Sequence, residues 1–387
     1  MEIFIKKEKL EEMIKRVDRA IEKNPIHFIL SGMLFEAEAS GEKLKITGGN
    51  ERFAITTTFN NNEQGDLEII KEGRVVIPAQ KLLSIVKKMP EGEIHLFKDD
   101  ERKQITISSN TKKTEFVLYT MDATEYPRFP KSTENVFTVN GEAFADGLNK
   151  TVFASLKSDA RPQLNGINVV LEDGTLQLEA TDAHRLAVKN NIKIQSDFSD
   201  KNFILPEKSA KEIIKLIKNE SSDVKVYFND NFIIIETKRD VIFSKLIRGS
   251  YPNVRRVIPE QHDISVTLEK KKLLHAIERA NILAEYNNTI MFEVGGEDSM
   301  ISDDIKIYQK EGELGKSTEF ISAQKIEGIK EDEVFTIAFN AEYILDALKH
   351  IEDELIILGF VDNIRPFSVI GEKEGDGYIQ VIMPVRP

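Results

Sequence analysis

A strand-then-helix pattern begins at Phe137-Thr138-Val139. Apolar residues follow at positions 144, 148, 152 and 156, and this spacing places them on one face of a helix. The same pattern begins at Ile3-Phe4-Ile5 and again at Val266-Thr267-Leu268. The three copies lie 134 and 129 residues apart, so one structural unit occurs three times in the chain.

A second unit repeats at a similar period. It begins at Val75-Val76-Ile77-Pro78, at Phe203-Ile204-Leu205-Pro206 and at Phe335-Thr336-Ile337. In each copy a helical spacing of apolar residues follows, and then another short apolar run. Stretches between the helices alternate as half-buried strands do, for example Lys43–Thr47 and Thr175–Glu179.

This period of about 130 residues is too long for a solenoid repeat. We therefore predict an α+β fold of three similar domains, each with two helices and antiparallel sheets. The predicted domains are residues 1–131, 132–261 and 262–387. Linkers are expected near residues 126–135 and 259–263.

The composition is typical of a globular protein: of 387 residues, 41% are apolar and 30% are charged. There are no cysteines, which excludes disulfides, Cys-ligated zinc, iron–sulfur clusters and thiol nucleophiles. Charges stand at the N-terminus where a signal peptide needs its apolar core. No apolar run approaches the roughly 20 residues that span a bilayer. We expect a cytoplasmic protein with no membrane partner.

The formal net charge is −12, which argues against binding nucleic acid with the whole surface. The helical windows 6–23, 79–88, 140–161, 207–218, 269–286 and 340–350 hold 22 Lys and Arg against 15 Asp and Glu. That excess of seven positive charges leaves −19 for the rest of the chain. Either these residues populate solvated helix faces, or the helices form one mildly basic surface on an acidic body. The composition leaves both open.

The chain has no phosphate-binding loop, dinucleotide-binding glycine motif, nucleophile elbow or zinc-protease motif. Its six histidines are scattered without metal-ligand spacing. The carboxylate pairs Asp99-Asp100 and Asp303-Asp304 lie in polar, turn-like contexts and are expected to be surface charges. We predict no catalytic residue, no metal and no cofactor.

Three separated segments are more specific. They are Thr181-Asp182-Ala183-His184-Arg185-Leu186-Ala187, Tyr251-Pro252-Asn253-Val254-Arg255-Arg256-Val257-Ile258-Pro259 and the closing Val381-Ile382-Met383-Pro384-Val385-Arg386-Pro387. In this order, and together with the threefold repeat, they resemble the bacterial sliding clamps, the family of DNA polymerase III beta subunits. The resemblance runs the full length of the chain.

The resemblance implies a DNA clamp fold, in which two chains associate head to tail as a homodimer. Six domains then close a ring around double-stranded DNA. Such a ring is a processivity factor that is retained topologically, so its phosphate contacts can stay few and it needs no base readout. The chain would be a non-catalytic subunit of the DNA polymerase III holoenzyme. Its implied partners are a clamp loader, the polymerase III alpha and delta subunits, other polymerases and repair proteins.

The resemblance also implies a hydrophobic cleft between the middle and C-terminal domains, which binds short linear motifs of those partners. Leu, Val, Met and Pro would form an apolar groove, and His and Arg at its rim would hold polar or acidic groups. The matching positions are Leu164, Thr181, His184, Arg185, Leu186, Pro252, Val257, Val381, Met383, Pro384, Val385 and Arg386.

Two further sets of residues follow from the resemblance. The family uses a basic residue in the loop after the first helix, where Lys23 and Asn24 stand here. Further candidates for charge facing the DNA channel are Arg161, Lys208, Lys270, Lys271 and Lys272. For the subunit contact, the resemblance points to Phe116 and Leu118 on the first domain against Ile282 and Leu283 on the third.

One departure from the family pattern concerns the cleft. Ala183 replaces the usual glycine, and alanine is strained there if the turn needs positive φ. Two other readings of the chain stay open. It could be a three-domain scaffold that binds peptides without closing into a ring, or an undetected hydrolase that uses Asp182 and His184.

Overall fold

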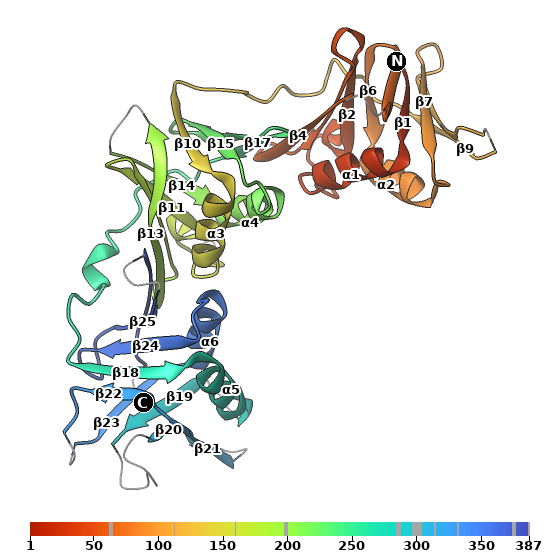
Figure 1. Ribbon diagram of the computed structural model, residues 1–387. Helices are drawn as coiled ribbons and strands as arrows, with labels where there is room; N and C mark the ends of the chain where they lie inside the picture. The colour runs from red at the N-terminus through yellow and green to blue at the C-terminus, as the bar shows by residue number, and fades with distance from the viewer. Residues whose placement is uncertain are drawn as a thin grey trace. The chain divides into compact units, whose positions relative to one another are not determined.

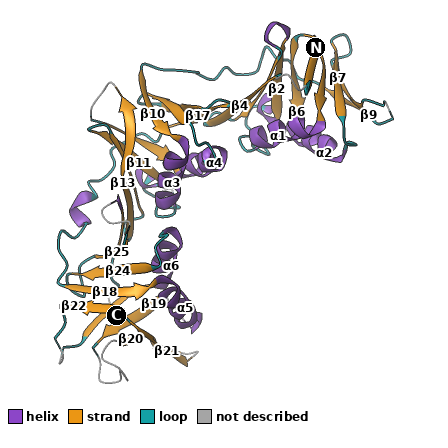
Figure 2. Cartoon of the chain, viewed as in Figure 1, coloured by secondary structure: helices purple, strands orange, loops and turns teal. Residues whose placement is uncertain are grey.

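The computed structural model describes residues 1–61, 65–111, 113–158, 160–196, 200–283, 288–295, 304–312, 315–330, 333–373 and 377–385. Within them the predicted order of elements recurs three times (Figures 1 and 2). Short 3₁₀ turns are labelled η. The N-terminal repeat contains β1 (Glu2–Lys6), α1 (Lys7–Asp18), η1 (Phe28–Ser31), β2 (Gly32–Glu38), η2 (Ala39–Gly41), β3 (Lys43–Gly49), β4 (Phe53–Asn60), β5 (Leu67–Lys71), β6 (Gly73–Pro78), α2 (Ala79–Lys88), β7 (Glu93–Asp99), β8 (Gln104–Ser109) and β9 (Glu115–Tyr119).

The other two repeats follow the same plan. The middle repeat contains β10 (Asn135–Asn140), α3 (Gly141–Val152), η3 (Pro162–Leu164), β11 (Gly166–Glu172), β12 (Thr175–Thr181), β13 (Arg185–Ser196), β14 (Lys201–Pro206), α4 (Glu207–Ile217), β15 (Asp223–Phe228), β16 (Phe232–Glu236), β17 (Asp240–Lys245) and η4 (Arg255–Val257). The C-terminal repeat contains β18 (Ile264–Glu269), α5 (Lys270–Ala280), η5 (Asn281–Leu283), β19 (Thr289–Val294), β20 (Asp304–Gly312), β21 (Gly315–Ser322), β22 (Lys325–Glu327), β23 (Phe335–Asn340), α6 (Ala341–His350), β24 (Leu355–Phe360), β25 (Phe367–Gly371) and β26 (Tyr378–Ile382).

The predicted helices are all present, and each begins within one residue of its window. The first helix of every repeat is shorter than predicted and ends five to nine residues early. After α1, for example, the N–H groups of Ala20 and Ile21 bond to carbonyls only three residues back, which ends the α-helical ladder. The observed helices therefore hold 16 Lys and Arg against 11 Asp and Glu, a smaller excess than the windows gave.

The described chain packs as two compact units, and the middle repeat contributes to both. The first consists mainly of residues 1–142 and 215–246, and the second mainly of residues 143–194, 200–214 and 247–385. In the first unit one sheet has the order β5-β1-β7-β8-β9, and another runs β6-β2-β3-β4-β17-β16-β15-β10. In the second unit the sheets run β14-β11-β12-β13-β26-β25-β24-β18-β22 and β21-β20-β19-β23.

Two antiparallel strand pairs join neighbouring repeats, and both use equivalent strands. In each, the third strand after a repeat's first helix pairs with the last strand of the next repeat: β4 with β17, and β13 with β26. Ala54 lies opposite Phe243 in the first junction, and Leu186 lies opposite Val381 in the second. The register matches as well, because Ala54 and Leu186 each pair with the last residue of the preceding strand.

The helices cover one face of these sheets. In the N-terminal repeat α1 packs against α2, β3 and β4, and in the C-terminal repeat α5 packs against α6, β20 and β21 (Figure 1). The approach of α1 is close, because a Cβ on Gly48 of β3 would overlap the side chains of Val17 and Ile21. Buried Leu10, Met13, Ile14 and Val17 form the inner face of α1, as their spacing predicts.

Candidate functional site

The loop between β12 and β13 forms a tight turn fixed by its own side chains. Asp182 Oδ1 accepts the backbone N–H groups of His184 and Arg185 at 2.9 and 3.0 Å. The Thr181 hydroxyl donates to the Arg185 carbonyl at 2.6 Å. Ala183 lies between them with φ at +77°, in the left-handed region that favours glycine. The turn therefore does have a positive φ at this position, and Ala183 is strained in it.

The side chain of Arg185 is buried rather than placed at a rim. It is only 8% exposed, and its guanidinium donates to Asp182 Oδ2 at 3.0 Å, Asp346 Oδ2 at 2.8 Å and the Phe153 carbonyl at 2.8 Å. It also lies over the rings of Phe153 and Tyr343. Because α3 precedes Phe153 and α6 holds Tyr343 and Asp346, this one cation connects the middle and C-terminal repeats. The N–H groups of the Arg185 guanidinium bond to acceptors inside the protein, so we infer that Arg185 holds the neighbouring residues of this surface in position.

His184 is exposed and lies beside the C-terminal segment. The Met383 N–H donates to the His184 carbonyl at 2.9 Å, and the His184 ring stacks over Tyr343 with centroids 6.4 Å apart. The next bond along the chain is from the Val385 N–H to the Ala338 carbonyl at 2.8 Å. The first of these bonds holds the C-terminal segment against the middle repeat, and the second holds it against β23. Met383 lies at the surface.

An apolar cluster lies at the junction of β13 and β26. Buried Leu186, Val188, Val254 and Val381 pack together there. Tyr251 packs against the cluster, and its phenol oxygen accepts the Thr181 N–H at 2.9 Å. Leu164, the last residue of the turn η3 in the middle repeat, is also buried.

The remaining predicted cleft residues are spread more widely. Pro252 borders a hollow of about 450 Å³, and exposed Val257 borders another of about 510 Å³ together with Val361 and Pro366. Pro384 is half-buried, and Arg386 lies outside the described residues.

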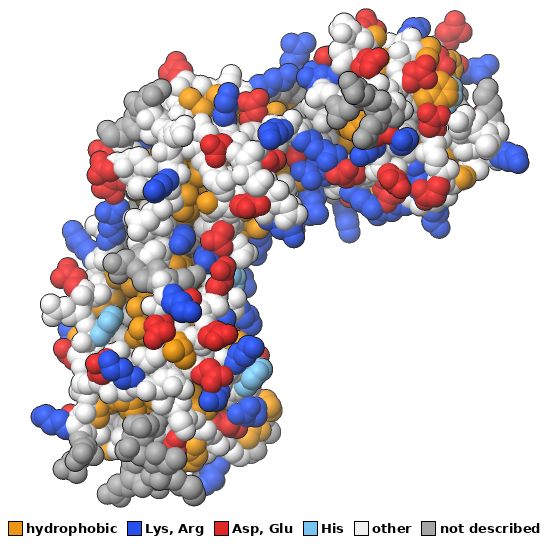
Figure 3. All heavy atoms as spheres, viewed as in Figure 1, with side chains coloured by type: hydrophobic (Ala, Val, Ile, Leu, Met, Phe, Trp, Pro, Cys, Tyr) orange, Lys and Arg blue, Asp and Glu red, His pale blue; other side chains and the backbone are white. Residues whose placement is uncertain are grey.

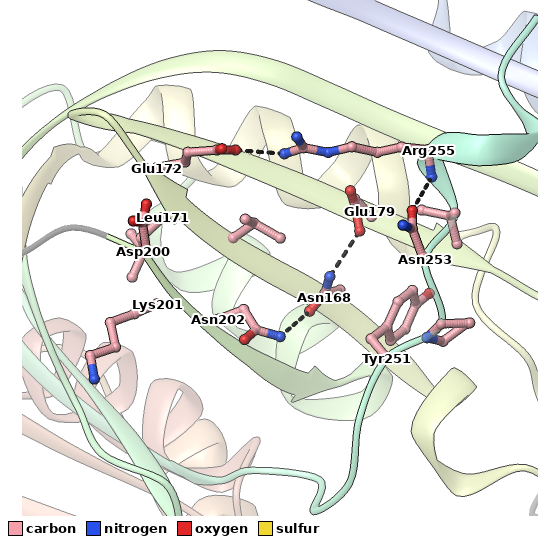
Figure 4. Close-up of a pocket in the computed structure, with 13 residues that line it drawn as sticks. Asn168, Leu171, Glu172, Glu179, Asp200, Lys201, Asn202, Tyr251, Asn253 and Arg255 are labelled. Carbon is pink, nitrogen blue, oxygen red and sulfur yellow. Dashed lines mark hydrogen bonds and ion pairs between the residues drawn. The ribbon is translucent and has the colours of Figure 1, made fainter.

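The hollow beside Pro252 is lined largely by polar groups (Figure 4). Its buried carboxylate is Glu179, which accepts a hydrogen bond from the Asn168 amide at 2.8 Å and another from Gln177. Burial raises the pKa of Glu179 above its ordinary value, against the effect of those two amides. Arg255 at the edge of the hollow pairs with Glu172 at 2.7 Å. None of these five polar side chains was among the predicted cleft residues.

The residues predicted to face DNA differ in whether their charged groups bond to other groups of the protein. Lys23, Asn24, Arg161, Lys208 and Lys271 are exposed. Lys272 is exposed and pairs with Glu269 at 2.8 Å, while the Lys270 ammonium donates to the Ile351 carbonyl at 2.6 Å. The Lys270 side chain therefore links the start of α5 to the residue that follows α6. Figure 3 shows Lys and Arg mixed with Asp and Glu over the part of the chain that holds α1 and α2; α1 itself carries both signs, whereas the charged residues of α2 are all lysines.

Strand β9 of the N-terminal repeat and strand β21 of the C-terminal repeat each lie at a sheet edge, with a strand on one side only among the described residues. Strand β9 carries Phe116, 39% exposed, and half-buried Leu118. Ile282, 76% exposed, and half-buried Leu283 lie in η5, which packs against β21. All four residues predicted for a subunit contact thus lie next to an open strand edge.

Three family models match the chain in order and without overlap. Residues 1–130 match the N-terminal domain of the DNA polymerase III beta subunit, residues 138–253 its central domain and residues 255–386 its C-terminal domain. The chain belongs to the DNA polymerase III beta subunit family.

Individual members of this family match over the whole chain. A beta sliding clamp of Staphylococcus epidermidis is 28% identical over 100% of this chain and 99% of its own length. The crystal structure of the Bacillus subtilis DNA polymerase sliding clamp superposes with a TM-score of 0.90 at 29% identity, covering 100% and 99% of the two chains. The beta subunit of Streptococcus pyogenes gives 0.90 at 26% identity, covering 100% of each chain. The α+β clamp fold of three repeats is confirmed.

Sequence reasoning about this family member missed three residues around the cleft: Phe153, Tyr343 and Asp346. They surround Arg185 from two repeats. A signal existed for Tyr343, because it is a half-exposed aromatic residue in the second helix of a repeat whose apolar positions are filled by Ile344, Leu345 and Leu348. Nothing in the sequence predicts that Arg185 and Asp346 meet across 161 residues.

Among the residues that the structure describes, no group of three or more His, Asp or Glu side chains could hold a metal ion. No described helix is long and apolar enough to cross a membrane.

Proposed function

We propose that this chain is a DNA polymerase processivity factor, a homodimeric ring that encircles double-stranded DNA and tethers polymerases through a peptide-binding cleft. It acts as a non-catalytic subunit of a DNA polymerase III holoenzyme in the cytoplasm. A clamp loader opens and closes the ring. The polymerase III alpha and delta subunits, other polymerases and repair proteins compete for the cleft.

The open strand edges carry this proposal. Within the chain, β4 pairs with β17 and β13 with β26, always the third strand after a repeat's first helix with the last strand of the next repeat. The same rule assigns β21 of the C-terminal repeat to the last strand of a following repeat. Among the described residues β21 has no such neighbour, and β9 is the last strand of the first repeat. A second copy can therefore supply the missing strand, and two such contacts would close a head-to-tail ring in which β9 and β21 are both paired.

The register of this contact follows from the repeats. Ile5 and Val139 occupy matching places in the first two repeats. Strand pairing leads from Ile5 through β7 and β8 to β9, and from Val139 through β15 and β16 to β17. On these two routes Val117 of β9 is the equivalent of Phe243. Strand pairs followed from Pro78 and Asn340, which each precede the second helix of a repeat, make Lys316 of β21 the equivalent of Ala54 when the Gln309–Ser317 register is continued to the next residue, where a register shift begins. Since Phe243 lies opposite Ala54, Val117 should lie opposite the partner's Lys316.

Strand alternation then places Phe116 and Leu118 on the helix side of the junction. At the junction of the first two repeats, Asp240 faces α1, because its carboxylate accepts from Arg16 at 3.1 Å. Phe116 and Leu118 lie on the face equivalent to that of Asp240, so they should meet the partner's Ile282 and Leu283. Apolar burial at each end of the chain would then stabilise closure.

Cysteine cross-linking tests the contact, and the natural absence of cysteine makes it clean. A chain carrying Val117→Cys and Lys316→Cys should oxidise to a species of twice 44.0 kDa on a non-reducing gel. The matched control pairs Val117→Cys with Ser317→Cys, whose side chain points to the other face of the strand, and should stay uncross-linked. A ladder of larger oligomers would mean that the contact does not close, and a monomer would favour the scaffold reading.

Topological retention tests the function itself. The cross-linkable protein is loaded onto nicked circular DNA with a clamp loader and ATP, then oxidised. The closed ring should survive denaturing detergent on the circle and be lost when the DNA is cut. Protein that leaves the intact circle with salt alone would be bound electrostatically, and the ring mechanism would be wrong for this chain.

The surface around Leu186, Val381, Met383 and His184 supports the peptide cleft. It combines a buried apolar cluster with exposed groups at its edge, and methionine adapts to several partners. Substituting Met383→Ala should weaken binding of a polymerase C-terminal peptide about tenfold and leave the dimer intact. Lys325→Ala, an exposed residue paired with Glu327 of its own strand, is the control. Equal affinity in both variants would place the peptide elsewhere.

The geometry argues against a hydrolase that uses Asp182 and His184. The Asp182 carboxylate already accepts two backbone N–H groups and the Arg185 guanidinium. The His184 ring instead stacks on Tyr343. A general base must reach the proton that it takes, and this carboxylate is committed to holding a turn.

A further inference from the structure

The N-terminal repeat contains a hollow of about 440 Å³ that none of the surfaces above uses. Its apolar wall consists of Ile29, Leu30, Pro127 and Phe129. Leu30 is buried against Leu34, Val76 and Tyr126, so the floor belongs to a packed cluster.

This hollow has the same structural parts as the half of the predicted cleft that lies in the middle repeat. In both, a 3₁₀ turn delivers a leucine: η1 delivers Leu30 and η3 delivers Leu164. In both, a side-chain oxygen caps the loop before the third strand. Asn50 Oδ1 accepts the N–H groups two and three residues on at 2.7 and 2.9 Å, as Asp182 does.

A buried tyrosine followed by proline completes each site. In the middle repeat the pair is Tyr251-Pro252, and in the N-terminal repeat it is Tyr126-Pro127. Burial raises the pKa of both phenols. Both phenols bond to the backbone of the second strand: the Tyr126 hydroxyl donates to the Thr47 carbonyl at 3.4 Å, and the Tyr251 oxygen accepts the Thr181 N–H at 2.9 Å. The duplication of the chain has therefore produced two hollows from the same parts.

The two sites differ in charge. The N-terminal hollow is bordered by the carboxylates of Glu51 and Glu125. Glu51 occupies the place of Ala183 in the loop and is 3.1 Å from the His27 ring nitrogen. Glu125 has no ionic partner among the described residues, so the rim attracts cations.

Exposed apolar side chains extend the surface beside the hollow. Ile26 and Phe28 are 89% and 75% exposed and flank His27. Exposed apolar groups gathered next to a hollow, with charge at the rim, are typical of a recognition surface.

We propose that this hollow is a second peptide-docking site, for an extended segment with one bulky apolar anchor and a Lys or Arg within two residues of it. The anchor enters between Leu30, Pro127 and Phe129, and the cation lies against Glu51 and Glu125. The analogy rests partly on the peptide cleft proposed above, but the site itself lies entirely in the first unit. The full-length protein can therefore carry this site whether or not the other cleft binds peptides.

The test uses full-length protein and a labelled heptapeptide with one apolar anchor, Gly-Gln-Lys-Phe-Ser-Lys-Gly. Methyl NMR should show shifts at Ile29 and Leu30, with a Kd in the range of tens of micromolar. The double variant Glu51→Lys with Glu125→Lys, both exposed, should weaken this binding at least tenfold. Met383→Glu, in the other cleft, should leave the Ile29 and Leu30 shifts unchanged. A peptide with Glu in place of both lysines should bind at least tenfold more weakly.

Several outcomes would overturn the proposal. Shifts confined to Leu186 and Val381 would assign the peptide to the other cleft alone. Unchanged affinity in the Glu51→Lys, Glu125→Lys variant would remove the charge argument, and no shift at Ile29 or Leu30 up to 1 mM peptide would exclude this ligand class. Shifts at Ile29 and Leu30 that appear without peptide as protein concentration rises would instead identify a second copy as the occupant. Loss of the Leu186 and Val381 shifts in Met383→Glu, with the Ile29 and Leu30 shifts retained, would instead show two independent peptide sites and would support the proposal.

Discussion

Arg185 decides how the region around β13 and β26 is held. A single guanidinium bonds to Asp182, Asp346 and the Phe153 carbonyl while it lies between two aromatic rings. The planar fork of arginine can point at three acceptors at once, and a lysine ammonium on a flexible stem cannot hold the same directions.

Substituting Arg185→Lys should lower the free energy of unfolding by about 2 kcal/mol, because buried acceptors lose their donors. Arg255→Lys is the matched control, since Arg255 makes an exposed pair with Glu172, and it should change stability by about 0.5 kcal/mol or less. Urea unfolding of both variants measures this. Equal effects would mean that Arg185 contributes only a charge.

The strained turn gives a prediction of opposite sign. Ala183→Gly should raise the free energy of unfolding by about 1 kcal/mol, because glycine adopts a φ of +77° without steric conflict. Ala143→Gly, on the exposed side of α3, should instead lower stability by about 1 kcal/mol. If Ala183→Gly destabilised the protein as Ala143→Gly does, the turn would not be strained.

Glu179 makes stability depend on pH in an unusual direction. Its pKa is raised in the folded chain by burial, so its contribution is present at low pH and is lost as the pH rises through that raised pKa. The stability of the natural chain relative to Glu179→Gln should therefore fall between pH 4 and pH 8. Glu319→Gln should show the reverse at lower pH: Arg279 lowers the pKa of Glu319 below its ordinary value of 4.5, so the contribution of Glu319 is present above that value and is lost as the pH falls below it. Denaturant melts of the three proteins measure the Glu179 slope between pH 4 and pH 8 and the Glu319 slope below pH 5, and slopes of the same sign would contradict the burial argument.

At the scale of elements, the sequence predicted the repeats well because periodicity decides them. Each helix start lay within one residue of the prediction, since Pro78, Pro206 and the apolar spacing mark the boundaries. The ends of α1, α3 and α5 were missed, because apolar residues such as Leu156 continue the spacing after the helix has stopped.

The site was less predictable than the fold. Family motifs placed Leu186, Val381 and Met383 near one another, and the structure does bring them together. They gave Arg185 a role at the rim, whereas packing by Phe153 and Tyr343 from distant segments buries it. Such contacts depend on how repeats meet, and no local pattern records that.

The edge strand β9 makes an element-scale prediction. Phe116→Ser should convert the dimer to a 44.0 kDa monomer in sedimentation at micromolar concentration, because the junction loses a buried apolar group. Phe97→Ser is the control: Phe97 is 40% exposed against 39% for Phe116, but it lies on β7 inside the same sheet. A dimer that survives Phe116→Ser, or dissociates equally in both variants, would place the subunit contact elsewhere.

At the scale of the whole molecule, the charge is poorly suited to tight DNA binding. The net charge is −12, and the described helices carry an excess of only five positive side chains. Retention on DNA must therefore come from closure, while the helices supply a weak, salt-sensitive attraction.

Free protein should accordingly bind linear duplex DNA with a Kd of about 10⁻⁵ M or weaker at physiological salt. Lys271→Glu with Lys272→Glu should weaken this further and flatten the salt dependence, as measured by fluorescence anisotropy between 50 and 200 mM salt. Lys193→Glu with Lys225→Glu, which changes the same charge on exposed strand positions, is the control. Equal losses in both double variants would mean that DNA responds only to net charge.

The common register of the β4–β17 and β13–β26 junctions has an evolutionary consequence. Each repeat presents one edge of each kind, so a single repeat of about 130 residues is already a complete protomer for a closed circle. An ancestral gene that encoded one such repeat could have built the ring from six separate chains. Two fusions in tandem would reduce the six seams between chains to two, and opening either one of them would be enough to admit DNA.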